Sequence, residues 1–252
     1  MKIVVIGGTG LIGSQVAAKL KVAGHEVVAA SPNTGVNAVT GEGLAVALKG
    51  ASVVVDVANS PSFADDAVLD FFVRAGRNLA AAEKGAGVSH HVALSVVGTE
   101  RLLDSGYFRA KLAQEESIAS SGIPWTLVRA TQFFEFAGAI AGAATIDGVT
   151  RATSRAIQPV ASADVAALVA EAALAAPLNG MVEIAGPEKM PVAELVRRYF
   201  ESIGEPKDVL ADDAAGYFGT IIDDRSLTPD AGARISEKRF GDWLAAQPKR
   251  AV

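Results

Sequence analysis

Apolar residues in the first half of the chain occur in two kinds of run, short continuous ones and longer periodic ones. The short runs are rich in β-branched residues, which is typical of strands buried on both faces of a sheet. The longer runs repeat an apolar residue every three or four positions, which predicts helices. We expect strands at Lys2–Ile6, Glu26–Ala30, Ser52–Ala58, Val88–Val97 and Trp125–Arg129, and helices at Leu11–Ala23, Leu44–Lys49, Asp65–Lys84 and Tyr107–Ser120. Strands that alternate with helices imply a parallel sheet with right-handed crossovers.

The pattern is weaker in two regions. Residues 31–43 are irregular, with a short strand expected at Val36–Val39. After about Thr131 the periodicity loosens. We expect there a helix that Asp164 caps and that ends at Ala175, a strand at Met181–Ala185, and helices at Val192–Ser202 and Phe240–Ala246. The segment Phe136–Ile146 falls well short of the ~20 apolar residues that a membrane-spanning helix requires, so we interpret it as buried or pocket-lining.

A glycine-rich loop separates the first expected strand from the first expected helix. It reads Gly7, Gly8, Thr9, Gly10, Leu11, Ile12 and Gly13. The first glycines permit a tight turn, Gly10 lets the backbone approach a phosphate, and Gly13 lets the helix pack close to the strand. Free N–H groups at the helix N-terminus then attract a pyrophosphate. The loop predicts a dinucleotide-binding βαβ unit, and a tight turn without a ligand is the alternative.

The end of the second expected strand bears on which dinucleotide binds. An acidic residue at that point would accept a hydrogen bond from the ribose 2′-hydroxyl of NAD. This chain instead has Ser31, Asn33 and Thr34. Hydroxyl and amide groups hydrogen-bond a 2′-phosphate without repelling it. We therefore expect a preference for NADP(H), with NAD(H) possible, and the alternative is that residues 31–34 are only a turn.

Three side chains suggest redox chemistry. Tyr107 and Lys111 stand four residues apart, so they share one face of the expected helix. We expect the Lys111 ammonium to lower the pKa of Tyr107. Such a tyrosine can give a proton to a carbonyl oxygen as hydride arrives. Ser95, near the carboxyl end of a strand, can hold the same oxygen. An exposed helical pair is the alternative interpretation of Tyr107 and Lys111.

These segments together resemble a known family. The chain is similar to short-chain dehydrogenases/reductases of the atypical or extended kind, and more closely to their NmrA-like NAD(P)H-binding branch, with its triphenylmethane reductase and quinone oxidoreductase relatives. The segments that carry the resemblance are residues 7–13, 93–98, 107–111 and 125–133. The resemblance implies that Lys111 also holds the nicotinamide ribose. It further implies that the cofactor is lined by Ala58, Asn59, Ser60, Ala130, Thr131 and Gln132.

Composition narrows the classes of function. The formal net charge is −5 and the sequence contains no long basic run, which argues against a nucleic-acid partner. The sequence has no cysteine, which excludes thiol catalysis and zinc–thiolate sites and is consistent with a cytoplasmic protein. No cluster of histidines accompanies His90 and His91, so we expect no metal site. We expect no membrane partner, and a homodimer is possible.

The sequence thus predicts an α/β fold with a Rossmann-type doubly wound parallel sheet in a single domain, residues 1–252. Residues 1–135 would form most of the cofactor-binding part, and residues from about 136 to 252 a small C-terminal substrate lobe. The expected function is NADP(H)-dependent reduction of a carbonyl or quinone-type small molecule. Ser95, Tyr107 and Lys111 would be the catalytic residues. The alternative is a non-catalytic, NmrA-like regulatory protein that senses NAD(P).

Overall fold

The computed structural model describes residues 1–247 and divides them into two compact units. The N-terminal unit comprises residues 1–129 and 165–182, and the C-terminal unit comprises residues 130–164 and the chain from residue 183 onward. The boundary therefore does not coincide with a single cut in the sequence. The expected division near residue 135, and the assignment of a substrate lobe to the residues beyond it, stay predictions.

The main sheet has seven strands in the order β12-β9-β5-β4-β3-β1-β2, which confirms the predicted fold class. β1 pairs in parallel with β2 on one side and with β3 on the other, and β3 pairs in parallel with β4. The chain therefore reverses its direction of travel across the sheet between β1 and β3, the position at which open α/β sheets bind ligands. The strands span Lys2–Ile6 (β1), Glu26–Ala30 (β2), Val53–Asp56 (β3), His90–Val96 (β4), Trp125–Ala130 (β5), Gly180–Ala185 (β9) and Arg234–Ile235 (β12).

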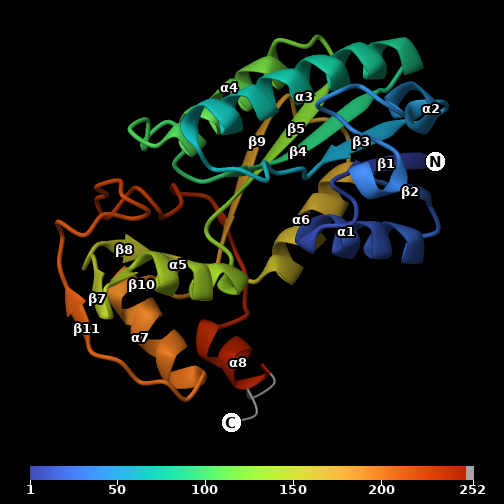
Figure 1. The fold of residues 1–252 in the computed structure, drawn as a ribbon. Coiled ribbons are helices and arrows are strands. Elements are labelled where there is room, and N and C mark those ends of the chain that lie inside the picture. Colours follow the sequence, from blue (N-terminus) through green and yellow to red (C-terminus); the bar gives the residue numbers. More distant parts are fainter. Residues whose placement is uncertain (248–252) are drawn as a thin grey trace. The chain divides into compact units, whose positions relative to one another are not determined.

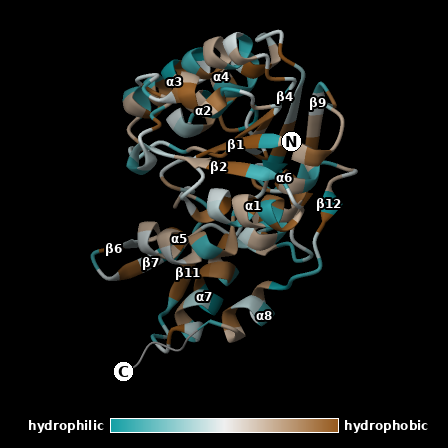
Figure 2. Ribbon diagram, turned by 90° about the vertical axis from the view of Figure 1, so that its right-hand side faces the viewer, coloured by the Kyte–Doolittle hydropathy of each residue, from teal (hydrophilic) through white to brown (hydrophobic). Residues whose placement is uncertain are grey.

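Helices cover both faces of the sheet in the N-terminal unit (Figure 1). α3 and α4 lie on one face, and α1 and α6 on the other. Val4, Val54 and Leu79 belong to one buried cluster between the sheet and the first of these helix layers. Figure 2 shows the same elements by hydropathy, with hydrophobic residues along β1 and both hydrophobic and hydrophilic residues along α3. The helices span Leu11–Val22 (α1), Leu44–Leu48 (α2), Asp65–Ala86 (α3), Gly106–Ala119 (α4) and Ser162–Leu174 (α6).

The C-terminal unit consists of short elements, and α7 packs against α5 within it. Its small sheets are β11-β7-β6 and β10-β8. Its strands span Thr145–Ile146 (β6), Val149–Ala152 (β7), Ala156–Ile157 (β8), Met190–Pro191 (β10) and Val209–Ala211 (β11). Its helices span Phe134–Phe136 (η2, a 3-10 helix), Ala137–Ala143 (α5), Val192–Ser202 (α7) and Phe240–Ala245 (α8).

Two expectations about local structure are corrected. Val36–Val39 is not a strand, because the side-chain amide of Asn78 donates to the carbonyls of Ala38 and Val39 at 2.9 Å each, and a 3-10 turn (η1, Pro32–Thr34) precedes it. Asp164 lies in the first turn of α6 rather than at its cap. The helix end is held instead by Glu135, which accepts hydrogen bonds from the backbone and the hydroxyl of Ser162 at 3.2 and 2.6 Å.

The apolar segment at residues 136–146 is also only partly as expected. It forms α5 and enters β6, with Ile140 and Ala141 buried. Phe136 and Ile146, however, are 44% and 71% exposed, so the segment is amphipathic rather than buried throughout. None of the helices within residues 1–247 is long and apolar enough to cross a lipid bilayer.

Candidate functional site

The glycine loop lies at the carboxyl end of β1, where the sheet order reverses. Gly7 has a φ of +76°, and a Cβ built on it would lie 2.8 Å from the backbone nitrogen of Ala58. A Cβ on Gly8 would lie 2.6 Å from the Cα of Ala29, and one on Gly13 would lie 2.1 Å from the carbonyl oxygen of Gly7. The fold itself therefore requires glycine at these three positions. The close approach of Gly7 to Ala58 places the loop beside the turn that follows β3.

Gly10 differs from its neighbours because the fold does not require its identity. A Cβ there would meet only the carbonyl oxygen of Gly7, at 3.3 Å. Gly10 is the N-cap residue of α1, and the first turn of that helix contains no acidic residue. The open side of Gly10 thus faces a helix N-terminus without a negative charge, which suits an anion such as a phosphate. The loop residues fit the pyrophosphate of a dinucleotide.

The turn after β2 presents polar groups of unequal accessibility. Ser31 is buried, whereas Asn33 and Thr34 are exposed. The Thr34 hydroxyl accepts a hydrogen bond from the backbone N–H of Ser31 at 2.8 Å and lies 2.9 Å from the carbonyl oxygen of the same residue. Thr34 therefore shapes the turn although it is exposed, and Asn33 is exposed beside it. Their contact with a ribose phosphate stays a prediction.

A buried chain of hydrogen bonds connects the turn after β3 to α4. The Asp56 carboxylate accepts a hydrogen bond from the backbone N–H of Ala58 at 3.1 Å and another from the side-chain amide of Gln114 at 2.9 Å. The amide oxygen of Gln114 in turn accepts a hydrogen bond from the Lys111 ammonium. That ammonium also donates to the carbonyl oxygen of Leu94 at 2.9 Å. The predicted cofactor-lining turn and the predicted catalytic lysine thus belong to one polar network.

Lys111 is buried, which is unusual for a lysine and affects its ionisation. Burial lowers its pKa to about 8, although the carboxylates of Asp56 and Glu115 act in the opposite direction. The ammonium lies 4.6 Å from the centroid of the Phe72 ring. It is therefore a poorly hydrated cation with protein acceptors for two of its three N–H bonds, a state suited to holding a polar ligand group.

The pKa of Tyr107 shifts in the direction opposite to the one predicted from the sequence. Its ring packs against Phe63, Phe72 and Phe108, with ring centroids 5.5, 6.4 and 5.9 Å away. Burial in this aromatic cluster raises the pKa of Tyr107 to about 12, instead of the decrease that we expected from Lys111. Desolvation of the phenolate is the cause of this rise, so Tyr107 keeps its proton.

Ser95 is engaged in a second buried network. Its hydroxyl donates to Glu115 at 2.5 Å, and Glu115 forms a two-point ion pair with Arg129, with N···O distances of 3.0 and 2.6 Å. Arg129 also pairs with Glu100 at 2.8 Å. The Ser95 proton is therefore directed to a carboxylate. Glu115 is only 5% exposed.

Two further predicted cofactor-lining residues belong to the C-terminal unit. Thr131 is buried, and its hydroxyl donates to the carbonyl oxygen of Gln158 at 2.6 Å. Gln132 is also buried, and its side-chain oxygen has no hydrogen-bond partner within the described residues. A buried amide oxygen of this kind is costly unless a ligand or water satisfies it, which fits the predicted role of Gln132.

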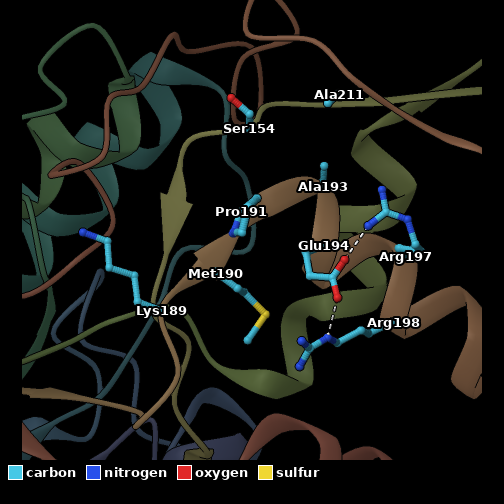
Figure 3. Close-up of a pocket in the computed structure, with 9 residues that line it drawn as sticks. All are labelled: Ser154, Lys189, Met190, Pro191, Ala193, Glu194, Arg197, Arg198 and Ala211. Carbon is cyan, nitrogen blue, oxygen red and sulfur yellow. Dashed lines mark hydrogen bonds and ion pairs between the residues drawn. The ribbon is translucent and has the colours of Figure 1, made fainter.

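A pocket of about 480 Å³ lies within the C-terminal unit. Figure 3 shows Glu194 between Arg197 and Arg198, whereas Lys189 extends away on the other side of Met190. Glu194 accepts a hydrogen bond from each arginine, and these contacts hold its pKa below the usual value. Because the cations pair with Glu194 or point elsewhere, they do not converge on one bound group.

Sequence reasoning missed the residues that hold the site together. None of Asp56, Gln114, Glu115 and Arg129 is among the predicted site residues. One signal was present: Asp56 ends an otherwise apolar strand, and a carboxylate at that position requires partners. Gln114 and Arg129 carry no comparable signal, because their partners are set by how the helix packs on the sheet.

Comparisons with known proteins found a matching family and a similar protein. The profile of the NAD(P)H-binding family matches residues 7–176. The (4-alkanoyl-5-oxo-2,5-dihydrofuran-3-yl)methyl phosphate reductase of Streptomyces griseus is 30% identical over 220 residues, which cover 81% of this chain and 74% of that protein.

Solved structures share the fold at lower identity. The NADPH-dependent quinone oxidoreductase of Escherichia coli, in complex with NADPH, superimposes with a TM-score of 0.66 at 20% identity, covering 96% of this chain and 98% of the other. A nucleoside-diphosphate-sugar epimerase of Staphylococcus aureus gives a TM-score of 0.72 at 14% identity, with 97% and 99% covered.

Proposed function

Since this chain belongs to the NAD(P)H-binding family, we propose that it is an NADPH-dependent reductase of small molecules in which a carbonyl is conjugated to a double bond, such as a quinone or an unsaturated lactone. The observation that carries the proposal is the geometry of the N-terminal unit. A glycine loop with an open face at Gly10 lies beside the Ala58 turn, and that turn is connected through Asp56 and Gln114 to the buried cation Lys111.

The cofactor is held in this proposal by backbone and side-chain groups with separate tasks. The N-terminus of α1 and Gly10 bind the pyrophosphate, and Ser31, Asn33 and Thr34 contact the 2′-phosphate. Ala58, Asn59, Ser60, Thr131 and Gln132 line the dinucleotide, and Lys111 donates to the nicotinamide ribose. When bound, the reduced nicotinamide supplies the hydride. NADPH is the proposed preference over NADH because no carboxylate lies in the turn after β2.

Tyr107 is the proposed proton donor, and its high pKa bears on the choice of acceptor. A phenol with a pKa of about 12 is protonated throughout the physiological pH range, but it is a weaker acid than free tyrosine. Reduction of an isolated ketone leaves a strongly basic alkoxide, which depends on a good acid. Reduction of a conjugated acceptor spreads the negative charge over several atoms, so it depends less on the acid.

Ser95 has a positioning role in this proposal. Since its proton is donated to Glu115, the hydroxyl offers a substrate only its lone pairs. Its main effect is to hold α4, which carries Tyr107 and Lys111, against β4. Relatives support the substrate class. The Streptomyces griseus protein is named as the reductase of an oxo-dihydrofuran with an alkanoyl group, and the Escherichia coli fold neighbour as a quinone oxidoreductase.

The experiment is NADPH consumption by the purified chain with three acceptors: a quinone, an unsaturated lactone and a saturated ketone. The proposal predicts consumption with at least one conjugated acceptor and slower consumption with the ketone. Equal rates with all three would contradict the substrate class. Tight NADPH binding without consumption by any acceptor would contradict the enzymatic function and favour the alternative, a cofactor-sensing protein.

A further inference from the structure

The buried network around Lys111 is larger than the proposed function requires. Asp56, Gln114 and Lys111 are between 3% and 4% exposed, so each polar group lost its contact with water when the chain folded. Such burial is costly unless every group finds a partner. The side chains come from two elements far apart in the sequence, since Asp56 and Gln114 are separated by 58 positions.

We propose that Asp56 and Gln114 are positioning residues that hold Lys111 and the Ala58 turn in one fixed arrangement, so that two cofactor-binding segments are oriented by a single buried hydrogen-bonded chain. This inference rests on the proposed function, which places both segments on the cofactor. Neither Asp56 nor Gln114 touches the cofactor in this account.

The orientation of the Gln114 amide is set by its two neighbours. Its oxygen must accept from the Lys111 ammonium, which has only N–H groups, and its nitrogen must donate to the Asp56 carboxylate. The amide dipole is thus aligned between a positive and a negative charge. Both oxygens of Asp56 are used, one by Gln114 and the other by the backbone of Ala58, so movement of either partner affects the other.

The Gln114 amide, which lies between Lys111 and Asp56, also keeps the Lys111 ammonium from pairing directly with the Asp56 carboxylate. A direct Lys111–Asp56 ion pair would neutralise the ammonium and hold it against β3. With Gln114 between them, Asp56 still stabilises the positive charge while the ammonium stays bonded to the carbonyl oxygen of Leu94 in β4. The charged groups that act on Lys111 are Asp56 from β3 and Glu115 from its own helix, and α3 contributes the uncharged ring of Phe72.

The test is the dissociation constant of NADPH measured against pH by cofactor fluorescence. Wild-type binding should weaken as pH rises through about 8, because Lys111 then loses its proton. Lys111→Met removes that dependence and weakens binding at neutral pH by roughly tenfold, as expected for the loss of one charged hydrogen bond.

Two variants of the network should then shift the alkaline limb of the pH profile in opposite directions. The alkaline limb is the rise of the NADPH dissociation constant as pH rises through about 8. Asp56→Asn removes a negative charge but keeps the shape, so the limb should move by about one unit to lower pH. Gln114→Glu puts a carboxylate beside the ammonium, so the limb should move by about one unit to higher pH. Asp66→Asn and Gln247→Glu make the same chemical changes at exposed positions and should leave the limb in place.

The outcomes separate this inference from the proposed function. If Lys111→Met removes the limb but both network variants leave it unmoved, the inference is overturned and the role of Lys111 stands. If Lys111→Met leaves the limb unchanged, the assignment of Lys111 to the cofactor is wrong, and the inference falls with it. Should Asp56→Asn not fold, as judged by thermal melting, Gln114→Glu alone decides.

Discussion

The glycine loop and helix α4 contribute to the same proposed site by opposite means. The loop offers main-chain N–H groups and the absence of side chains, and close approaches to Ala29, Ala58 and Gly7 set its shape. α4 offers side chains that are oriented by buried partners on β3, β4 and β5. Substitutions that add a bulky side chain should therefore impair the glycine loop. Substitutions that remove a charge or a hydrogen bond should impair α4.

The largest expected effect tests the glycine loop, which offers main-chain groups to the cofactor. Gly10→Val places a branched side chain where the pyrophosphate must approach, at a position where a Cβ meets only one protein atom, at 3.3 Å. NADPH affinity should fall roughly 1,000-fold, about 4 kcal/mol, with little change in the melting temperature. Gly85→Val is the matched control, because a Cβ at Gly85 meets nothing within 4 Å. Unchanged binding by Gly10→Val would mean that the dinucleotide binds elsewhere.

The next effect tests the ion pair that holds α4. Glu115→Gln leaves the buried Arg129 guanidinium with a neutral partner and weakens the acceptor for Ser95. The free energy of unfolding should fall by about 3 kcal/mol, measured by urea denaturation. Glu116→Gln makes the same change at the adjacent exposed residue and should have almost no effect. Equal stability of the two variants would show that α4 is held by apolar packing alone.

Tyr107→Phe sharpens the comparison by deleting one functional group from α4. The ring packing with Phe72 is kept, and only the proton donor is lost. We expect turnover on a conjugated acceptor to fall about 10²-fold, the low end for general acid catalysis, with NADPH affinity almost unchanged. Steady-state rates and fluorescence titration measure the two quantities. Full activity on a quinone would mean that Tyr107 is not the acid.

The smallest effect concerns cofactor choice. Asn33→Asp places a carboxylate at an exposed position of the turn after β2, where the proposal puts the 2′-phosphate. Charge repulsion near the protein surface should weaken NADPH binding about fivefold, or ~1 kcal/mol, and leave NADH binding unchanged or stronger. The ratio of the two dissociation constants reports this directly. Wild-type affinity that favours NADH would contradict the cofactor prediction itself.

The same contrast explains what the sequence could predict. Glycine spacing after an apolar strand indicates the loop because the pattern and its consequence lie within one segment. The β6–β7 hairpin was missed although its signal was local. Asp147 and Gly148 have φ values of +50° and +79°, the conformation that an Asp-Gly hairpin turn adopts. The hydrogen bond between Ser95 and Glu115 could not be predicted, for a different reason. Glu115 is 20 residues away, and its burial depends on the packing of α4 against the sheet.

The most direct test of the account is a crystal structure of the chain with bound NADPH. The account predicts pyrophosphate oxygens within hydrogen-bonding distance of the N–H groups of Leu11 and Ile12, and a nicotinamide ribose hydroxyl on the Lys111 ammonium. It also predicts that Gln114 still bridges Lys111 and Asp56. A dinucleotide whose ribose lies away from Lys111, with the glycine loop nevertheless occupied, would contradict the claim that the loop and α4 serve one cofactor.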